Sequence, residues 1–265
     1  MSWILPACLG TALAAALTLT GCQREPATEP PTAAPATAGP AEISPASTPA
    51  LGAEAAKAAA WQARGNEPFW MIAVEGDTLT WTSPDSESIV WTGLTRSERP
   101  DGFDLHAVRE PHHLSVSATA TVCRDSMASM PYPHTVTIKL DGKTLAGCGG
   151  DPMSLLAIGE WTVASVAGEP TGERPPTLQF LPEGRAAGFA GCNRWTSGTA
   201  LSGEGVSFTQ VATTMMACPE PAMAAERRFL EVLSRTTRHD FGADGSLQLI
   251  AGDTVIAVAT RTVDG

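Results

Sequence analysis

Hydrophobic and polar residues alternate in short runs through most of residues 61–265. A period of two indicates half-buried β-strands, because successive side chains of a strand point to opposite faces of the sheet. The runs read WMIAV, TLTWT, SIVWT, FDLHAV, HLSVSATATV and HTVTIKL, then WTVASV, TLQFL, VSFTQV, SLQLI and TVIAVAT. Turn-forming residues separate them, at Gly76-Asp77, Asp141-Gly142, Pro182-Glu183-Gly184, Asp244-Gly245 and Gly252-Asp253. The pattern predicts a mainly β fold of the α+β type, with two small antiparallel β-sheet or open-barrel domains.

One stretch, residues 219–236, changes to the helical period. Its apolar residues recur every three or four positions, at Ala222, Ala225, Phe229, Val232 and Leu233. A proline directly after Cys218 suits the first turn of a helix. We therefore expect a single packed helix, in the second of the two domains.

The first 22 residues form an apolar run without a charged side chain, as in an export signal. The run ends in Leu19-Thr20-Gly21-Cys22, which resembles the lipobox of bacterial lipoproteins and implies that Cys22 is diacylated. No Lys or Arg precedes the run, which departs from the usual signal and suggests a start codon further upstream. An uncleaved membrane anchor is the alternative, but Pro6 and Gly10 interrupt the run. The residue after Cys22 is Gln23. By resemblance to the sorting signals of bacterial lipoproteins, this residue suggests that the protein is delivered to the outer membrane and faces the periplasm.

Residues 23–60 are dominated by Pro, Ala and Thr, with almost no large apolar side chain to bury, which is typical of a linker. The remaining residues are enough for two small domains. We expect these domains at residues 61–155 and 156–265, because a glycine-rich segment within residues 147–161 ends one series of strand-like runs and a new run begins at Trp161.

The net charge of −11 lies entirely after residue 22. An acidic chain is a poor partner for nucleic acid and for an anionic membrane surface. The lipid anchor at Cys22 is therefore the expected contact with the membrane, and attraction to basic proteins remains open. The protein or small-molecule partner is not identified by the sequence.

The second half contains AGFAGCNRWTSG, TTMMACPEP and the helical stretch with Glu226 and Phe229-Leu230. On these motifs residues 159–261 resemble the META domain, the family of the heat-inducible lipoprotein HslJ. The resemblance implies a small α+β domain of an envelope lipoprotein linked to heat and drug stress, without an established catalytic residue. The first half carries ARGNEPFW, CRDSMASMPYPHTV and LAGCGG, and it resembles an uncharacterised domain that accompanies META in lipoproteins.

Four cysteines follow the linker, and four cysteines allow three pairings. The resemblance implies a disulfide between Cys192 and Cys218. If each domain contains one disulfide, the other bond joins Cys123 to Cys148. A metal or redox site is the alternative reading of these cysteines. Neither domain has a Cys-x-x-Cys motif, and exported small domains generally use cysteines in structural disulfides.

The candidate binding residues are Asn66, Glu67 and Trp70 in the first half and Asn193 and Arg194 in the second. Asn66-Glu67 and Arg124-Asp125 could form a small charged pocket, but turn capping and surface ion pairing are the more common roles of such residues, and we favour them. The five histidines are expected to be solvated or at the core edge, with no metal site. Met127, Met130, Met215 and Met216 flank the cysteines and are expected to fill the core.

No nucleophile motif such as Gly-x-Ser-x-Gly occurs. We therefore expect a non-enzymatic envelope protein without a cofactor, which acts as a binding or stress-tolerance module. The alternative is an inhibitor of a lysozyme-like or other periplasmic or host enzyme, because an acidic protein attracts a basic enzyme by electrostatic steering.

Overall fold

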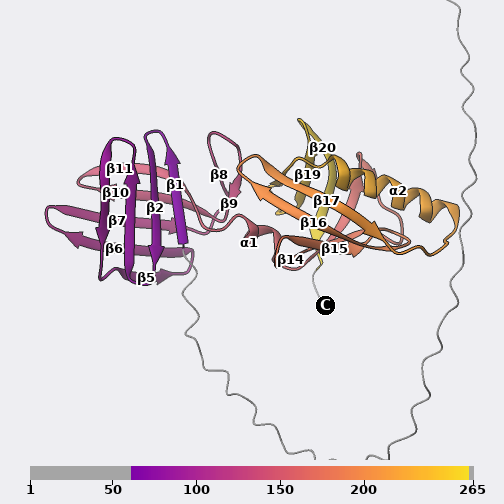
Figure 1. Cartoon of the computed structure of the whole chain (residues 1–265), viewed down its shortest axis with the longest axis horizontal. Helices are drawn as coiled ribbons and strands as arrows, with labels where there is room; N and C mark the ends of the chain where they lie inside the picture. Colours follow the sequence, from indigo (N-terminus) through magenta and orange to yellow (C-terminus); the bar gives the residue numbers. More distant parts are fainter. Residues whose placement is uncertain (1–60, 263–265) are drawn as a thin grey trace, which may run out of the picture. The chain divides into compact units, whose positions relative to one another are not determined.

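The computed structural model describes residues 61–262, which fold into two large antiparallel sheets, one two-stranded sheet and two helices (Figure 1). This confirms the predicted mainly β architecture. The predicted signal sequence, the lipidation site Cys22 and the linker lie outside the described residues. All described residues belong to one compact unit, and the predicted boundary at residue 155 stays a prediction. Neither helix in this range is long and apolar enough to cross a membrane.

The first sheet has nine strands in the order β4-β3-β2-β1-β11-β10-β7-β6-β5. Their bounds are β1 (Trp61–Asn66), β2 (Phe69–Glu75), β3 (Thr78–Ser83), β4 (Ser86–Trp91), β5 (Thr95–Arg99), β6 (Gly102–Arg109), β7 (His112–Thr119), β10 (His134–Leu140) and β11 (Lys143–Gly149). The sheet curls so that its end strand β4 approaches β6, and Arg109 of β6 donates a hydrogen bond to the carbonyl of Val90 in β4. A separate pair of short strands, β8 (Cys123–Arg124) and β9 (Pro131–Tyr132), follows β7.

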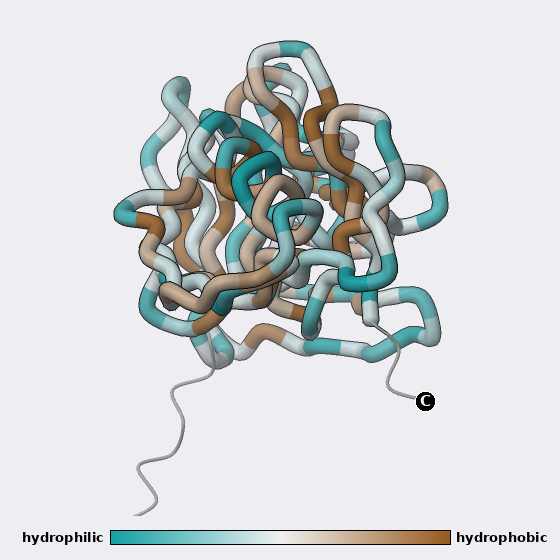
Figure 2. The backbone as a smooth tube through the Cα atoms, turned by 90° about the vertical axis from the view of Figure 1, so that its right-hand side faces the viewer, coloured by the Kyte–Doolittle hydropathy of each residue, from teal (hydrophilic) through white to brown (hydrophobic). Residues whose placement is uncertain are grey.

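Along each strand every second side chain points into the curl, and these side chains fill its interior. In β7 the buried residues are Leu114, Val116 and Ala118, while their neighbours are more exposed. Figure 2 shows the same division, with hydrophobic residues along strand segments and hydrophilic residues at many of the turns. Three buried tryptophans, Trp70, Trp81 and Trp91, supply much of the core volume.

Two glycines make room for Trp70, whose ring stacks on Trp81 with the centroids 5.8 Å apart. A Cβ on Gly65 would overlap Nε1 of this indole, and a Cβ on Gly147 would lie 2.6 Å from its ring edge. Both positions are therefore restricted to glycine. The motifs ARGNEPFW and LAGCGG thus contain the two sides of one packing contact.

The second sheet also has nine strands, in the order β17-β16-β15-β14-β12-β20-β19-β18, with β13 paired to β12. Their bounds are β12 (Glu160–Val166), β13 (Glu169–Pro170), β14 (Thr177–Leu181), β15 (Arg185–Phe189), β16 (Arg194–Ser202), β17 (Gly205–Thr213), β18 (Arg238–Phe241), β19 (Leu247–Ala251) and β20 (Thr254–Arg261). The short helix α1 (Met153–Leu156) precedes this sheet, and the longer helix α2 (Glu220–Arg235) lies between β17 and β18.

The helix predicted over residues 219–236 is confirmed within one residue at each end. Its buried face carries Phe229, Val232 and Leu233, which join the core of the second sheet. Glu226 lies on the same buried face, an unusual position for a carboxylate. This residue therefore needs hydrogen-bond partners inside the fold.

Each of the eleven strand-like runs overlaps a strand, and the five turn signals all connect neighbouring strands. The sequence pattern missed β1, β5, β11, β15, β16 and β18 and the two-residue strands β8, β9 and β13. Four of these strands, β1, β11, β15 and β16, contain glycine. Glycine lowers strand propensity in general, but here Gly65 and Gly147 are needed for the packing of Trp70. The tertiary contact therefore overrides the local preference.

His239 of β18 is a buried histidine without a hydrogen-bond partner. Only 3% of the residue is exposed, and both ring nitrogens lack a partner among the described residues. The ring packs edge-on against Phe241 at 5.8 Å between centroids. Burial lowers the pKa of His239 from 6.5 to about 4, since a charged imidazolium is poorly tolerated there. The side chain is thus in the core itself, deeper than the sequence suggested.

We predict that His239 destabilises the fold in mild acid. Its pKa is lower in the folded chain, so the unfolded chain takes up a proton first as the pH falls from 6.5 toward 4, and stability is lost in this window. Between pH 7.5 and pH 5.0 the wild-type chain should lose roughly 2 kcal/mol more unfolding free energy than a His239→Leu variant. Urea unfolding at both pH values measures this difference. The exposed control His113→Ala should behave as wild type, and equal losses in all three chains would contradict the prediction.

Candidate functional site

Both predicted disulfides are present. Cys123 is bonded to Cys148 and Cys192 to Cys218, with sequence separations of 25 and 26 residues. The first bond ties β8 to β11, and the second ties the turn before β16 to the loop that enters α2. Each bond closes a loop of a size for which the chain-entropy model gives about 3 kcal/mol of stabilisation. The cysteines thus have a structural role in both sheets.

Asn66 connects the β1–β2 turn to the loop that follows the first disulfide. Its Nδ2 donates to Oδ2 of Asp125 and to Oγ of Ser126, both at 3.0 Å. The other oxygen of Asp125 accepts hydrogen bonds from the backbone N–H groups of Met127 and Ala128 at 2.9 Å. Two irregular segments, far apart in the sequence, are therefore held together by one side-chain amide.

The environment keeps Asp125 ionised. Burial alone would raise the pKa of this carboxyl, but hydrogen bonds from the Ala128 N–H, the Asn66 amide and the Met127 N–H outweigh that effect. The pKa of Asp125 is consequently held below its ordinary value. The carboxylate serves both as a turn cap and as the acceptor for Asn66.

The other two candidates in the first half lie in contrasting places. Glu67 is exposed at the tip of the β1–β2 turn, and the next strand begins with Phe69, which is 48% exposed. Trp70, the third sequence-predicted residue, is fully buried and forms part of the core. The structure therefore brings Asn66 and Glu67 to the surface and assigns Trp70 to the packing beneath them.

A cavity of about 320 Å³ lies beside this turn. Its lining includes Asn66, Glu67, Arg124, Asp125 and the Cys123–Cys148 disulfide. The four polar residues that the sequence suggested as a charged pocket do surround one cavity. Arg124 also bonds to Asp240 at 3.0 Å and to the Phe241 carbonyl at 2.8 Å, so its guanidinium is already engaged.

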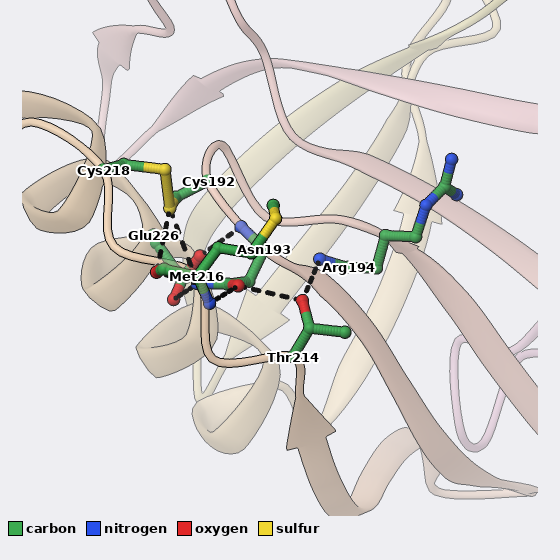
Figure 3. Close-up of a disulfide and its surroundings, with 7 residues drawn as sticks. All are labelled: Cys192, Asn193, Arg194, Thr214, Met216, Cys218 and Glu226. Carbon is green, nitrogen blue, oxygen red and sulfur yellow. Dashed lines mark hydrogen bonds between the residues drawn. A yellow bond between two sulfur atoms is a disulfide. The ribbon is translucent and has the colours of Figure 1, made fainter.

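Asn193 is the central residue of the second candidate site (Figure 3). It is 2% exposed, and its backbone N–H and Nδ2 donate to the two oxygens of Glu226 at 2.6 and 3.1 Å. Its Oδ1 accepts from the Met216 N–H at 2.7 Å and from the Thr214 hydroxyl at 2.8 Å. The side chain thus fastens the loop before α2 to the buried carboxylate on α2.

Arg194 does not join this network with its side chain. Its backbone N–H donates to Thr214 Oγ1 at 3.2 Å, and its exposed guanidinium points away from the disulfide (Figure 3). Sequence reasoning missed Glu226 as the partner of Asn193. The available signal was a carboxylate at helical spacing from Phe229 and Leu233, because an acid on an apolar helix face requires a buried partner.

The expectation that methionines fill the core is wrong for three of the four. Met130 is buried, whereas Met127, Met215 and Met216 are 79%, 98% and 56% exposed. Their loops are fixed by hydrogen bonds to Asp125 and Asn193, which hold the backbone and leave the side chains in solvent. Burial of the thioethers is therefore not needed to order these loops.

The remaining histidines are spread over the first sheet. His112 Nδ1 lies 2.7 Å from Asp141 Oδ2, and His113 lies 3.8 Å from Glu110. The histidine–carboxylate contact lowers the pKa of Asp141, with help from the His113 backbone N–H. Among residues 61–262 no group of three or more His, Cys, Asp or Glu side chains is arranged to hold a metal ion.

We predict that Asn193→Ala unfolds more easily than wild type by roughly 3 kcal/mol, because it removes the side-chain bonds to the loop and to Oε1 of the buried Glu226. Arg194→Ala is the adjacent control and should change stability by less than about 0.5 kcal/mol. Urea unfolding of the three chains at pH 7.5 provides the comparison. Equal stability of Asn193→Ala and Arg194→Ala would show that the network does not hold the loop.

Comparisons with known proteins gave two solved structures and one family model. No curated protein matches the chain. One solved structure, an NMR structure of a protein from Burkholderia xenovorans, is 26% identical over 42% of this chain and 86% of its own, with a TM-score of 0.36. A second NMR structure is 23% identical over 42% of this chain and 92% of its own, with a TM-score of 0.34. Residues 154–262, which contain the second sheet and its helix, match the model of the META domain family.

Proposed function

We propose that this protein is a lipid-anchored component of the bacterial envelope that acts by binding and not by catalysis. The observation that carries the proposal is the rigid β1–β2 turn, which presents Glu67 and Phe69 to solvent while Asn66 holds it to Asp125 and Ser126. The two disulfides support an exported protein, because such bonds persist in oxidising compartments. The lipobox-like Leu19-Thr20-Gly21-Cys22 supports the anchor.

A preorganised turn is well suited to binding. An aromatic side chain that is already ordered loses little conformational entropy when a partner covers it. Phe69 is half exposed, and the cavity of about 320 Å³ next to the turn offers a place for a side chain of the partner. The turn therefore combines an apolar anchor, a carboxylate and a recess.

The polar groups of both candidate sites serve the fold, which favours binding over catalysis. Asp125 caps its own loop and accepts from Asn66, while Glu226 is enclosed by Asn193. A general base must instead reach a proton of the substrate. The finer assignment to an HslJ-like stress-tolerance module rests on the motif resemblance of residues 159–261, and delivery to the outer membrane rests on Gln23.

Inhibition of a basic, lysozyme-like enzyme is the second candidate, favoured by the exposed Glu67–Phe69 turn on an acidic chain with net charge −11. Such a turn can enter a positively charged cleft under electrostatic steering. If the candidate is right, the chain from Gln23 onward should inhibit lysozyme in a cell-wall turbidity assay. A Glu67→Lys, Phe69→Ala variant should lose the inhibition and Val108→Ala should keep it. Absence of inhibition by the wild-type chain would remove this candidate and leave the anchored binding protein.

We predict that Cys22 carries the lipid. Cells that express the full chain with an alkyne-tagged palmitate analogue should yield a labelled protein in the membrane fraction. Cys22→Ser should lose the label and leave the membrane fraction, since the diacyl group provides stable anchoring. Cys8→Ser, in the same apolar run, is the matched control and should be labelled as wild type. A labelled Cys22→Ser protein would contradict the proposed anchor.

A further inference from the structure

A second cavity, of about 650 Å³, does not involve the β1–β2 turn. It is bordered by the segment between α1 and β12, the loop between β18 and β19 and the end of β20. Val122 and Arg124, at the start of β8, complete the border. This volume falls in the range of about 300–1,000 Å³ that is usual for small-molecule sites.

The wall of this cavity has an apolar part, formed by Val122, Ile158, Trp161 and Phe241, and a polar part. Ile158 is 47% exposed and Val122 is 37% exposed, so both leave hydrophobic surface in contact with water. Trp161 and Phe241 lie deeper and are almost fully buried. Exposed apolar side chains over an aromatic floor create a surface that gains free energy when an apolar ligand covers it.

Among the charged groups at the rim, Arg261 is the one that can receive an anion. Arg261 ends β20 directly opposite Trp161, and none of residues 61–262 provides an ion-pair partner for its guanidinium. Arg124 is engaged by Asp240 and the Phe241 carbonyl. The rim carboxylate Asp244 accepts from the N–H and hydroxyl of Ser246 at 3.0 and 2.7 Å, which lowers its pKa. Asp244 is therefore negatively charged and opposes an anion at its own end of the rim, so an anionic head must lie at Arg261.

We propose that this cavity binds a single-chain anionic amphiphile. The alkyl chain lies against Ile158, Val122 and Phe241, and the anionic head contacts Arg261. Fatty acids and alkyl phosphates share this chemistry, and both fit an apolar trough with one guanidinium at its rim. The site does not depend on the proposed binding turn, because no residue of that turn lines it.

Calorimetric titration of the full chain tests the proposal, with Cys22→Ser introduced so that no attached lipid competes. The probes are laurate, dodecyl phosphate and dodecyltrimethylammonium, each below its micelle concentration. Laurate or dodecyl phosphate should bind saturably, and the cationic probe at least tenfold more weakly. Comparison of the two anions distinguishes a carboxylate ligand from a phosphate ligand.

Variants locate the site. Arg261→Gln should weaken binding of the preferred anion about tenfold, equivalent to ~1.4 kcal/mol, and Ile158→Asp should abolish it. The matched controls Arg185→Gln and Val108→Asp replace an exposed arginine and an exposed valine elsewhere and should bind as wild type. Thermal unfolding verifies that each variant folds, and Arg261→Gln tests the site even where Ile158→Asp does not fold. Absence of saturable binding, equal binding of the cationic probe or unchanged affinity in Arg261→Gln would overturn the proposal.

Discussion

Each sheet depends on the same combination of a disulfide and an asparagine that hold an irregular loop. In the first sheet the Cys123–Cys148 bond fixes one end of the loop and Asn66 fixes Asp125 and Ser126 within it. In the second the Cys192–Cys218 bond and Asn193 hold the segment that enters α2. The disulfide limits the freedom of the unfolded chain, and the amide selects one folded conformation among those that remain. The two devices are complementary, since neither alone determines where the loop backbone lies.

This arrangement explains why apolar side chains remain in solvent next to rigid backbone. Met215 and Met216 follow a strand whose end is tied to Asn193, and Met127 follows the cap formed by Asp125. A loop ordered by its main chain does not have to bury its side chains, so they are free for contacts with other molecules. The same principle applies to Phe69, which stands on a turn secured from behind by Asn66. Rigid loops with exposed side chains are the usual carriers of binding function.

The sequence predicts the strands with clear alternation, the helix over residues 219–236 and both disulfides, because each depends on local patterning or on a recognisable motif. It fails where a distant contact decides the conformation. Gly65 and Gly147 lower the local preference for a strand. Both positions require glycine, because Trp70 occupies the space that a side chain would need. Glu226 is held by hydrogen bonds from Asn193, and the methionine loops are held by hydrogen bonds of their backbone. Neither kind of contact produces a periodic pattern in the sequence. The sequence indicated Asn66 and Asp125 as polar groups near strand ends. It did not predict the hydrogen bond between them.

The position of β1 has a mechanical consequence for a chain that is held at its N-terminal side. This strand begins at Trp61, the first described residue, and ends at Asn66, beside the exposed turn. A pull on the turn therefore travels along a single strand of six residues. Because both ends of this pull lie on the same strand, the covalent backbone of β1 carries the tension. The hydrogen bonds to β2 on one side and β11 on the other hold this strand in place and are not loaded between a bound partner and a tether.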